Sequence, residues 1–227
     1  MYEVTDGVPP RRRAALFDMD KTLIAEHSSR LYVRFQRDIG EATWLDSLRL
    51  TAWLLQYSVG LLDSTGVAQR IIGAYRGQAE ADLIAKCERW YPDYVRPHLS
   101  RVGAEVVRQR QAAGDFTAIV TASTRYASAP LARELGIEGI VATEVEVDER
   151  GVLTGGVVWP LCYAEGKVVR AERALSARGL SLSDASFYTD SITDMALLEA
   201  VAEPNVVNPD PRLRREAERR GWPILAW

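Results

Sequence analysis

Residues 14–23 read Ala14-Ala15-Leu16-Phe17-Asp18-Met19-Asp20-Lys21-Thr22-Leu23. The first four are apolar, as in a strand that is buried on both faces of a parallel sheet. We therefore predict a strand over residues 14–17, with Asp18 and Asp20 just beyond its carboxyl end. Ligands of open α/β sheets bind outside the carboxyl ends of the strands, which makes these two carboxylates candidate site residues.

Further apolar runs follow the same pattern, and helical patterns lie between them. The runs cover residues 116–120, 139–142, 185–189 and 204–207, and the helical patterns cover 97–113, 124–135, 165–178, 191–201 and 211–220. Gly114, Gly136 and Gly179 stand where helix C-caps are expected. Residues 144–147 and 152–159 predict a hairpin with a turn at Gly151. This alternation predicts an α/β fold with a doubly wound, mainly parallel sheet.

Residues 26–96 interrupt this alternation. They contain several helical patterns and no convincing strand, so we predict a helical cap inserted after the first strand. The expected domains are a core of residues 1–25 and 97–227 and a cap of residues 26–96. Apolar side chains between Trp44 and Tyr57 recur at helical spacing, which favours a core within the cap. A greasy substrate pocket or a membrane-facing patch is the alternative interpretation.

Length and composition are those of an ordinary globular protein. The chain has 227 residues, 47% of them hydrophobic, and a formal net charge of −3. These values exclude disordered and disulfide-scaffold classes and give no global attraction to nucleic acid. The basic residues 11–13 and 212–220 are expected to be solvated surface, and no nucleic-acid partner is predicted.

Three local features bear on compartment. Residues 1–10 carry Glu3 and Asp6 without an apolar core, which is unlike a signal peptide. The uncharged, mostly apolar stretch 50–62 is shorter than the roughly 20 residues that a membrane-spanning helix needs, so no stable membrane insertion is expected. Cys87 and Cys162 lie outside any metal or redox motif and are expected to be buried, reduced thiols. We predict a cytoplasmic protein.

Further polar residues lie just after two of the predicted strands and at the start of one predicted helix. Thr121 ends the run 116–120, Lys167 lies at the start of the helix at 165, and Asp190 and Asp194 follow the run 185–189. With Asp18 and Asp20 they would meet in one crevice if the strands are neighbours. Ser123 and Thr124 also offer hydroxyls, but Thr121 ends the strand directly.

The residue types narrow the chemistry. Four carboxylates cannot remain ionised together without a counter-charge, and oxygen ligands suit Mg²⁺, which commonly bridges to a substrate phosphate. A lysine, a hydroxyl and backbone N–H groups suit the remaining phosphate oxygens. A carboxylate can attack phosphorus, and a second one two residues on could protonate the leaving alkoxide and then activate water.

The chain resembles the haloacid dehalogenase (HAD) superfamily of phosphatases. Asp18-Met19-Asp20-Lys21-Thr22 looks like its first motif, Thr121 its second, Lys167 its third, and Asp190-Ser191-Ile192-Thr193-Asp194 its fourth. The helical insertion is similar to the cap of the phosphoserine-phosphatase-like branch, subfamily IB. The tail Val206-Val207-Asn208-Pro209-Asp210-Pro211 and the basic helix after it are also similar to that branch.

The resemblance implies a role for each matching residue. Asp18 would be the nucleophile and Asp20 the general acid and base. The phosphoryl group would be held by Thr121, Ala122 and Lys167. Mg²⁺ would be held by Asp18, the backbone carbonyl of Asp20, and Asp190. Thr22 would fix the loop, and Asp194 would support the metal water or Lys167.

The resemblance predicts a phosphomonoester hydrolase that acts through a phospho-aspartate on a small phosphorylated metabolite. Phosphoserine phosphatases carry an acidic residue nine positions after the nucleophile, whereas this chain has His27 there and Glu26 one position earlier. Both are candidate substrate contacts, and phosphoserine, histidinol phosphate and a lipid-linked phosphate all remain open. The alternatives are a phosphotransferase with the same intermediate and a receiver-type phosphoacceptor module, although a receiver lacks a cap.

Overall fold

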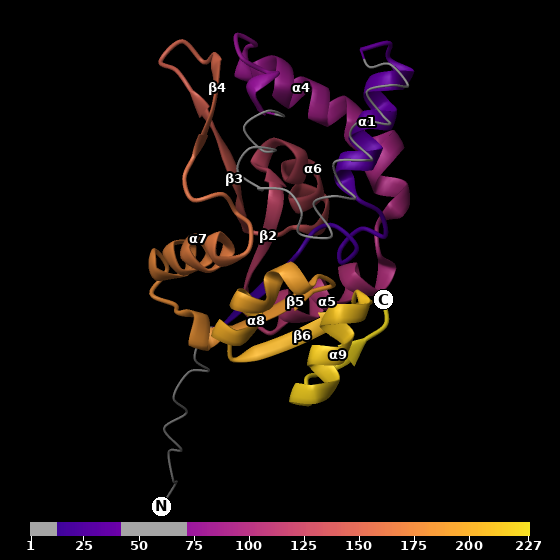
Figure 1. The fold of residues 1–227 in the computed structure, drawn as a ribbon, viewed down its shortest axis with the longest axis vertical. Helices are drawn as coiled ribbons and strands as arrows, with labels where there is room; N and C mark the ends of the chain where they lie inside the picture. Colours follow the sequence, from indigo (N-terminus) through magenta and orange to yellow (C-terminus); the bar gives the residue numbers. More distant parts are fainter. Residues whose placement is uncertain (1–12, 42–71) are drawn as a thin grey trace, which may run out of the picture.

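The structure is a computed structural model that describes residues 13–41 and 72–227 (Figure 1). The described residues form a seven-stranded sheet in the order β4-β3-β2-β1-β5-β6-β7. All neighbouring strands are parallel except β3 and β4, which form an antiparallel hairpin. The strands are β1 (Ala14–Phe17), β2 (Phe116–Thr124), β3 (Gly139–Val147), β4 (Leu153–Val158), β5 (Ala185–Thr189), β6 (Glu203–Val207) and β7 (Ile224–Leu225).

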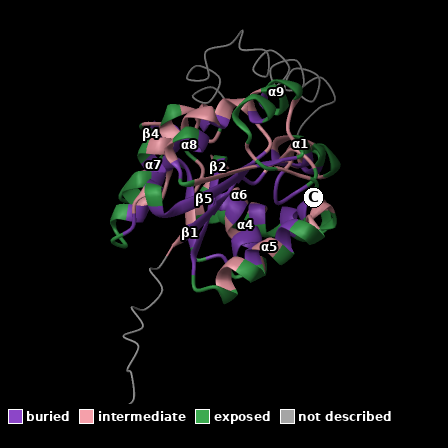
Figure 2. Cartoon of the chain, turned by 90° about the horizontal axis from the view of Figure 1, so that it is seen from below, coloured by how far each residue is buried: buried purple, intermediate pink, exposed green. Residues whose placement is uncertain are grey.

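Helices cover both faces of the sheet, as the apolar runs predict. Alternate residues of β1 point to opposite faces, Leu16 into one core and Phe17 into the other. Leu16 shares its core with α7 (Glu165–Ser176), α8 (Met195–Ala200) and α9 (Pro211–Arg220). Phe17 shares its core with α5 (Arg101–Ala112) and α6 (Arg125–Leu135). Figure 2 shows the buried strands between helices whose outer faces are exposed, so the doubly wound α/β prediction is confirmed.

Most expected elements are confirmed, with several corrections. β1, β5 and α9 have the expected bounds. The run 139–142 and the first arm of the expected hairpin are one continuous strand, β3. The helix expected at 97 begins at Arg101, because Arg96–His98 is a 3-10 turn and Ser100 caps the helix. The helix expected over 191–201 begins with a 3-10 turn, Ile192–Asp194, before α8.

Residues 26–41 and 72–96 lie outside the alternating pattern. They contain α1 (Ser28–Asp38), α4 (Glu80–Trp90) and the π turn Tyr91–Val95. The segment that leads into this insertion is hydrogen-bonded to the segment that leads out of it. Ala25 N donates to His98 O at 2.8 Å, and Ser100 N donates to Leu23 O at 2.9 Å. The apolar residues between Trp44 and Tyr57 and the stretch 50–62 lie outside the described residues.

Helix α4 packs on the core through a separate apolar cluster. Leu83 and Cys87 of α4 belong to one apolar cluster with residues of the β3–β4 hairpin and with Tyr126 of α6. Ion pairs run along the same interface: Arg125 contacts Glu80 at 2.7 Å, and Arg133 contacts Glu88 at 2.6 Å. Helix α4 and helix α6 are therefore joined by both apolar and charged contacts.

Two expectations from composition can be compared with the structure. Cys87 and Cys162 are free and buried, which confirms the prediction of reduced thiols. Within residues 13–41 and 72–227, every helix is too short or too polar to cross a membrane.

Candidate active site

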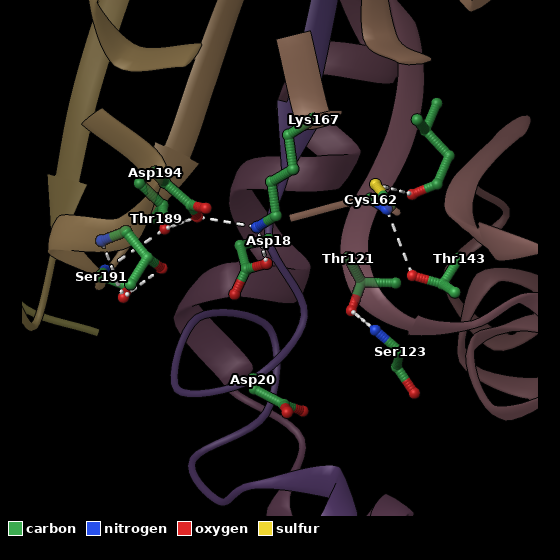
Figure 3. Close-up of polar contacts among 12 residues, drawn as sticks. Asp18, Asp20, Thr121, Ser123, Thr143, Cys162, Lys167, Thr189, Ser191 and Asp194 are labelled. Carbon is green, nitrogen blue, oxygen red and sulfur yellow. Dashed lines mark hydrogen bonds and ion pairs between the residues drawn. The ribbon is translucent and has the colours of Figure 1, made fainter. Parts of the chain in front are cut away.

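Lys167 joins two carboxylates at the carboxyl edge of the sheet (Figure 3). Its Nζ donates to Asp18 Oδ1 at 2.7 Å and to Asp194 Oδ2 at 2.8 Å. Asp18 directly follows β1, Lys167 lies in the first turn of α7, and Asp194 ends the turn after β5. All three side chains are buried or nearly so. The structure thus brings together three of the expected site residues from distant parts of the chain.

Burial and mutual repulsion shape the charges of this cluster. Burial raises the pKa of Asp18 to about 7, and Lys167 opposes part of that rise. Burial disfavours the charged form of Lys167, but Asp18 and Asp194 outweigh it and raise its pKa, so the ammonium remains protonated. Burial raises the pKa of Asp190 to about 8, with added repulsion from Asp18 and Asp194. The carboxylates exceed the positive charge available nearby, so the site favours a cation.

The loop after β5 carries Asp190 and Asp194. Strand β5 is the direct neighbour of β1, with Phe17 opposite Tyr188, so Asp18 and Asp190 follow adjacent strand ends. Asp18 N donates to Tyr188 O at 2.8 Å, which continues the pairing to the edge of the sheet. Thr189 Oγ1 donates to Asp194 Oδ2 at 2.6 Å. The expected meeting of the two acidic pairs at one sheet edge agrees with this topology.

Asp20 lies apart from the Lys167 cluster in this structure. Its Oδ1 accepts a hydrogen bond from Ser28 N, and its Oδ2 accepts one from Ser28 Oγ, each at 3.0 Å. Ser28 is the first residue of α1, so the Asp20 carboxylate faces the positive end of that helix. Figure 3 shows the carboxylate turned away from Asp18. Burial raises the pKa of Asp20, and the two bonds from Ser28 oppose that rise.

Strand β2 continues to Thr124, so the expectation that Thr121 ends the strand is wrong, and Thr121 instead lies beside a bulge near the carboxyl end of β2. Thr121 is buried, and its Oγ1 accepts a hydrogen bond from Ser123 N at 3.1 Å. The register with β3 shifts between Thr121 and Thr124, which marks a bulge at this edge. Ala122 is exposed there. The Thr124 hydroxyl instead caps α6 by accepting from Ala127 N at 3.4 Å.

The other site residues expected from the sequence, Thr22, Glu26 and His27, lie in the segment between β1 and α1. Thr22 is buried, and its Oγ1 has no hydrogen-bond partner among the residues that the structure describes. Glu26 lies 3.7 Å from Lys21 Nζ as a partly exposed ion pair. His27 is the N-cap of α1, and burial lowers its pKa, although nearby Asp20 opposes the change.

The donor set can be tested against a divalent cation. Within the described residues, no three His, Cys, Asp or Glu side chains gather closely enough to hold a metal by themselves. The expected set is two carboxylates and one backbone carbonyl, which suits Mg²⁺ because this ion keeps several waters. Asp194 Oδ1 is buried and has no hydrogen-bond partner within residues 13–41 and 72–227, so a polar ligand such as a metal-bound water fits beside it. The residues present at the site therefore fit a Mg²⁺ ion.

Three residues of the site had no assigned role from sequence reasoning. Ser28 holds Asp20, Thr189 holds Asp194, and Asp210 contacts the loop that carries Asp190. Asp210 followed by a proline at the start of a helical pattern is an N-cap signal that marks the residue. The contact with the Asp190 loop depends on β5 and β6 being neighbours, which the sequence does not reveal.

Comparison with known proteins identifies similar sequences and a similar structure. The profile of the haloacid dehalogenase-like hydrolases matches residues 15–199. The chain is 28% identical to a histidinol-phosphatase of Neisseria meningitidis, over 94% of this chain and 98% of that protein. It is 30% identical to a phosphoserine phosphatase of Mycobacterium tuberculosis, over 97% of this chain and 73% of that protein. A Bordetella pertussis protein of unknown function has a similar crystal structure, with a TM-score of 0.85, 36% identity, and coverage of 94% and 98%.

Proposed function

The chain belongs to the haloacid dehalogenase-like hydrolases, and from that membership and the contacts among Asp18, Lys167 and Asp194 we propose that it hydrolyses small phosphate monoesters through a phospho-aspartate. The contact between Lys167 and Asp18 carries the proposal, because it places a fixed positive charge beside a candidate nucleophile. A phosphatase needs such a charge near the oxygens of the transferring phosphoryl group.

The proposed reaction has two steps. Asp18 Oδ2 attacks phosphorus while Oδ1 stays bound to Lys167, and the bond between phosphorus and the alcohol oxygen breaks. The Asp20 carboxyl turns from Ser28 toward the substrate and gives a proton to the leaving alkoxide, and its raised pKa suits an acid. Water then attacks phosphorus and Asp20 takes its proton, the bond between phosphorus and Asp18 Oδ2 breaks, and inorganic phosphate leaves with the Asp18 carboxylate restored. Thr121 and the backbone at Ala122 complete the cradle for phosphate oxygens.

Mg²⁺ is the cofactor that we propose for this site. Asp18, Asp190 and the Asp20 carbonyl would hold it, and when bound it supplies positive charge to the developing phosphoryl oxygens. Asp18 must be ionised to attack, and its pKa of about 7 without a cation leaves part of it protonated at neutral pH. Lys167 also favours the ionised form, and Asp194 keeps Lys167 in place.

We propose that residues 26–96 form a cap domain on a core of residues 1–25 and 97–227. The paired crossings at residues 23–25 and 98–100 support these boundaries, since the chain leaves and re-enters the core at one place. In Figure 1, α1 and α4 lie beyond the carboxyl end of β2. A cap in that place would shield the intermediate from bulk water and contact the leaving group.

Among amino-alcohol phosphates, histidinol phosphate is the substrate that we favour over phosphoserine. The Neisseria meningitidis histidinol-phosphatase matches along nearly its whole length. Glu26 pairs with Lys21, and the next position holds His27, so the acidic residue expected of a phosphoserine phosphatase is displaced.

The test is release of phosphate from both esters with Mg²⁺ present. We expect a higher kcat/KM for histidinol phosphate, and loss of turnover for both esters in Asp18→Asn with an unchanged circular dichroism spectrum. Glu41→Gln is the matched control, because it removes a carboxylate that pairs with Lys86. Wild-type turnover in Asp18→Asn would refute the nucleophile assignment. Phosphorylated product formed from an added alcohol would indicate a phosphotransferase instead.

A further inference from the structure

We propose that Asp210 is a positioning residue that fixes the metal-binding orientation of Asp190. The inference rests on the proposed function, in which Asp190 holds the divalent cation. Asp210 itself would contact neither the cation nor the substrate. It would act through the backbone of the loop that follows β5.

Asp210 contacts that loop at both sides of Ser191. Its backbone N–H donates to Asp190 O at 2.9 Å, and its Oδ2 accepts from Ile192 N at 2.7 Å. Strands β5 and β6 are parallel neighbours, with Thr189 opposite Val206, so the loops that follow them lie side by side. One residue thus holds the peptide groups immediately after Asp190, and the backbone direction there determines where the Asp190 carboxylate points.

The conformation of Asp210 is itself restricted. Pro209 precedes it and Pro211 follows it, and a following proline favours the extended backbone that Asp210 adopts, with φ −59° and ψ 159°. Its Oδ1 accepts from Arg212 N at 2.7 Å and from Leu213 N at 3.0 Å, at the start of α9. Helix α9 is anchored in the core by Leu213, which is fully buried. Asp210 is therefore itself held in place when it contacts the loop that carries Asp190.

Capping of α9 alone does not explain these contacts. The cap uses Oδ1, whereas Oδ2 reaches Ile192 in a different loop. Serine at position 210 separates the two functions, because its short side chain can cap a helix but cannot reach Ile192. Asp210→Ser therefore removes the side-chain contact with Ile192 while keeping a helix cap and the backbone bond to Asp190 O.

The experiment measures Mn²⁺ binding by electron paramagnetic resonance, with Mn²⁺ as the probe in place of Mg²⁺. The proteins are the wild type, Asp210→Ser, Asp190→Asn as the metal-ligand reference, and Ser100→Ala. Ser100→Ala is the matched control, because it removes the N-cap of α5, which accepts from Gly103 N at 3.0 Å. Thermal midpoints identify any general loss of stability.

We expect Asp210→Ser to raise the Mn²⁺ dissociation constant about 10-fold or more, as loss of an outer partner of a metal ligand does. Its kcat should recover at high Mg²⁺ while KM for the ester stays unchanged, and Ser100→Ala should bind Mn²⁺ like the wild type. Should Asp210→Ser fail to fold, Asp210→Asn replaces it, because its amide leaves one of the N–H groups without an acceptor and predicts the same direction.

The outcomes distinguish failure of the proposed metal site from failure of the proposed role of Asp210. Wild-type Mn²⁺ binding by Asp190→Asn would refute the metal site, and the inference with it. Loss of binding by Asp190→Asn together with wild-type binding by the Asp210 variant would overturn the inference alone. Equal weakening in Ser100→Ala would overturn it as well, because the effect would then follow from helix destabilisation.

Discussion

Lys167 is the residue on which the charge balance of the site depends. Removing three ions from water costs several kcal/mol for each, and only close pairing offsets that cost. Lys167 pairs with Asp18 and Asp194, and Thr189 gives Asp194 one more hydrogen bond. A buried cluster of this kind adds little net stability compared with apolar packing, so its presence favours a chemical role over a structural one.

Lys167→Met leaves Asp18 and Asp194 buried without their partner. We expect a loss of roughly 3–5 kcal/mol in the free energy of unfolding, measured by urea titration in EDTA buffer. The loss should grow with pH, because the pKa of Asp18 is already raised to about 7 from 3.8 and would rise further without Lys167. A carboxyl whose folded pKa exceeds its unfolded pKa favours folding at low pH, and that stability disappears as pH rises through the folded value.

The double variant Lys167→Met/Asp194→Asn supplies the control. It removes one of the two unpaired carboxylates, so part of the stability should return at pH 8 and less at pH 5. A loss for Lys167→Met that is the same at pH 5 and pH 8 would contradict the argument, since lost packing alone does not titrate.

The start of helix α7 shows how an element positions a site residue. The helix begins at Glu165, and the turn before it places Leu161 O where a side chain at position 166 would lie. A Cβ on Gly166 would be 1.9 Å from that carbonyl oxygen. Only glycine fits there, which explains why a glycine directly precedes the lysine of the site.

Gly166→Ala should therefore move the first turn of α7 and the lysine with it. The clash is with backbone, which cannot rotate away as a side chain can, so we expect about 1–3 kcal/mol of destabilisation by urea titration. Phosphatase kcat should fall as well. Gly73→Ala is the matched control, since an added Cβ there would have no atom of another described residue within 4 Å. Equal stability of the two variants would contradict this expectation, because it would mean that the turn before α7 can move to accommodate a Cβ at position 166.

Across the whole molecule, the strands that can be predicted from the sequence are those that are buried along their length. Strands β1 and β5 are buried along their full length, so each is a continuous apolar run with clear ends. Strand β7 has only two half-buried residues, Ile224 and Leu225, and leaves no such signal. The residues placed at strand ends were predictable because a parallel sheet gathers those ends on one edge. The contacts of Ser28 and Asp210 were not, because they depend on which loops are neighbours in space.

The two thiols report on different parts of the molecule. Cys87 lies in the apolar cluster between α4, α6 and the hairpin, whereas Cys162 lies in the core that covers one face of the sheet. Burial raises the pKa of each thiol to about 12. Because the thiolate is the reactive form, both should react very slowly with iodoacetamide at pH 8 in the folded state.

Denaturant should expose the two thiols in a definite order. Among the described residues, the cluster around Cys87 is the smaller one, and exposed ion pairs border it, so we expect it to open at a lower urea concentration than the core around Cys162. Mass spectrometry after a short iodoacetamide pulse measures labelling at each site, and Cys87→Ala isolates the signal of Cys162. Simultaneous labelling at every urea concentration would mean that α4 and the core unfold as one unit. Separate labelling would mean that α4 can leave helix α6 while the sheet that carries Asp18 remains folded, which is the independence that a cap needs in order to admit substrate.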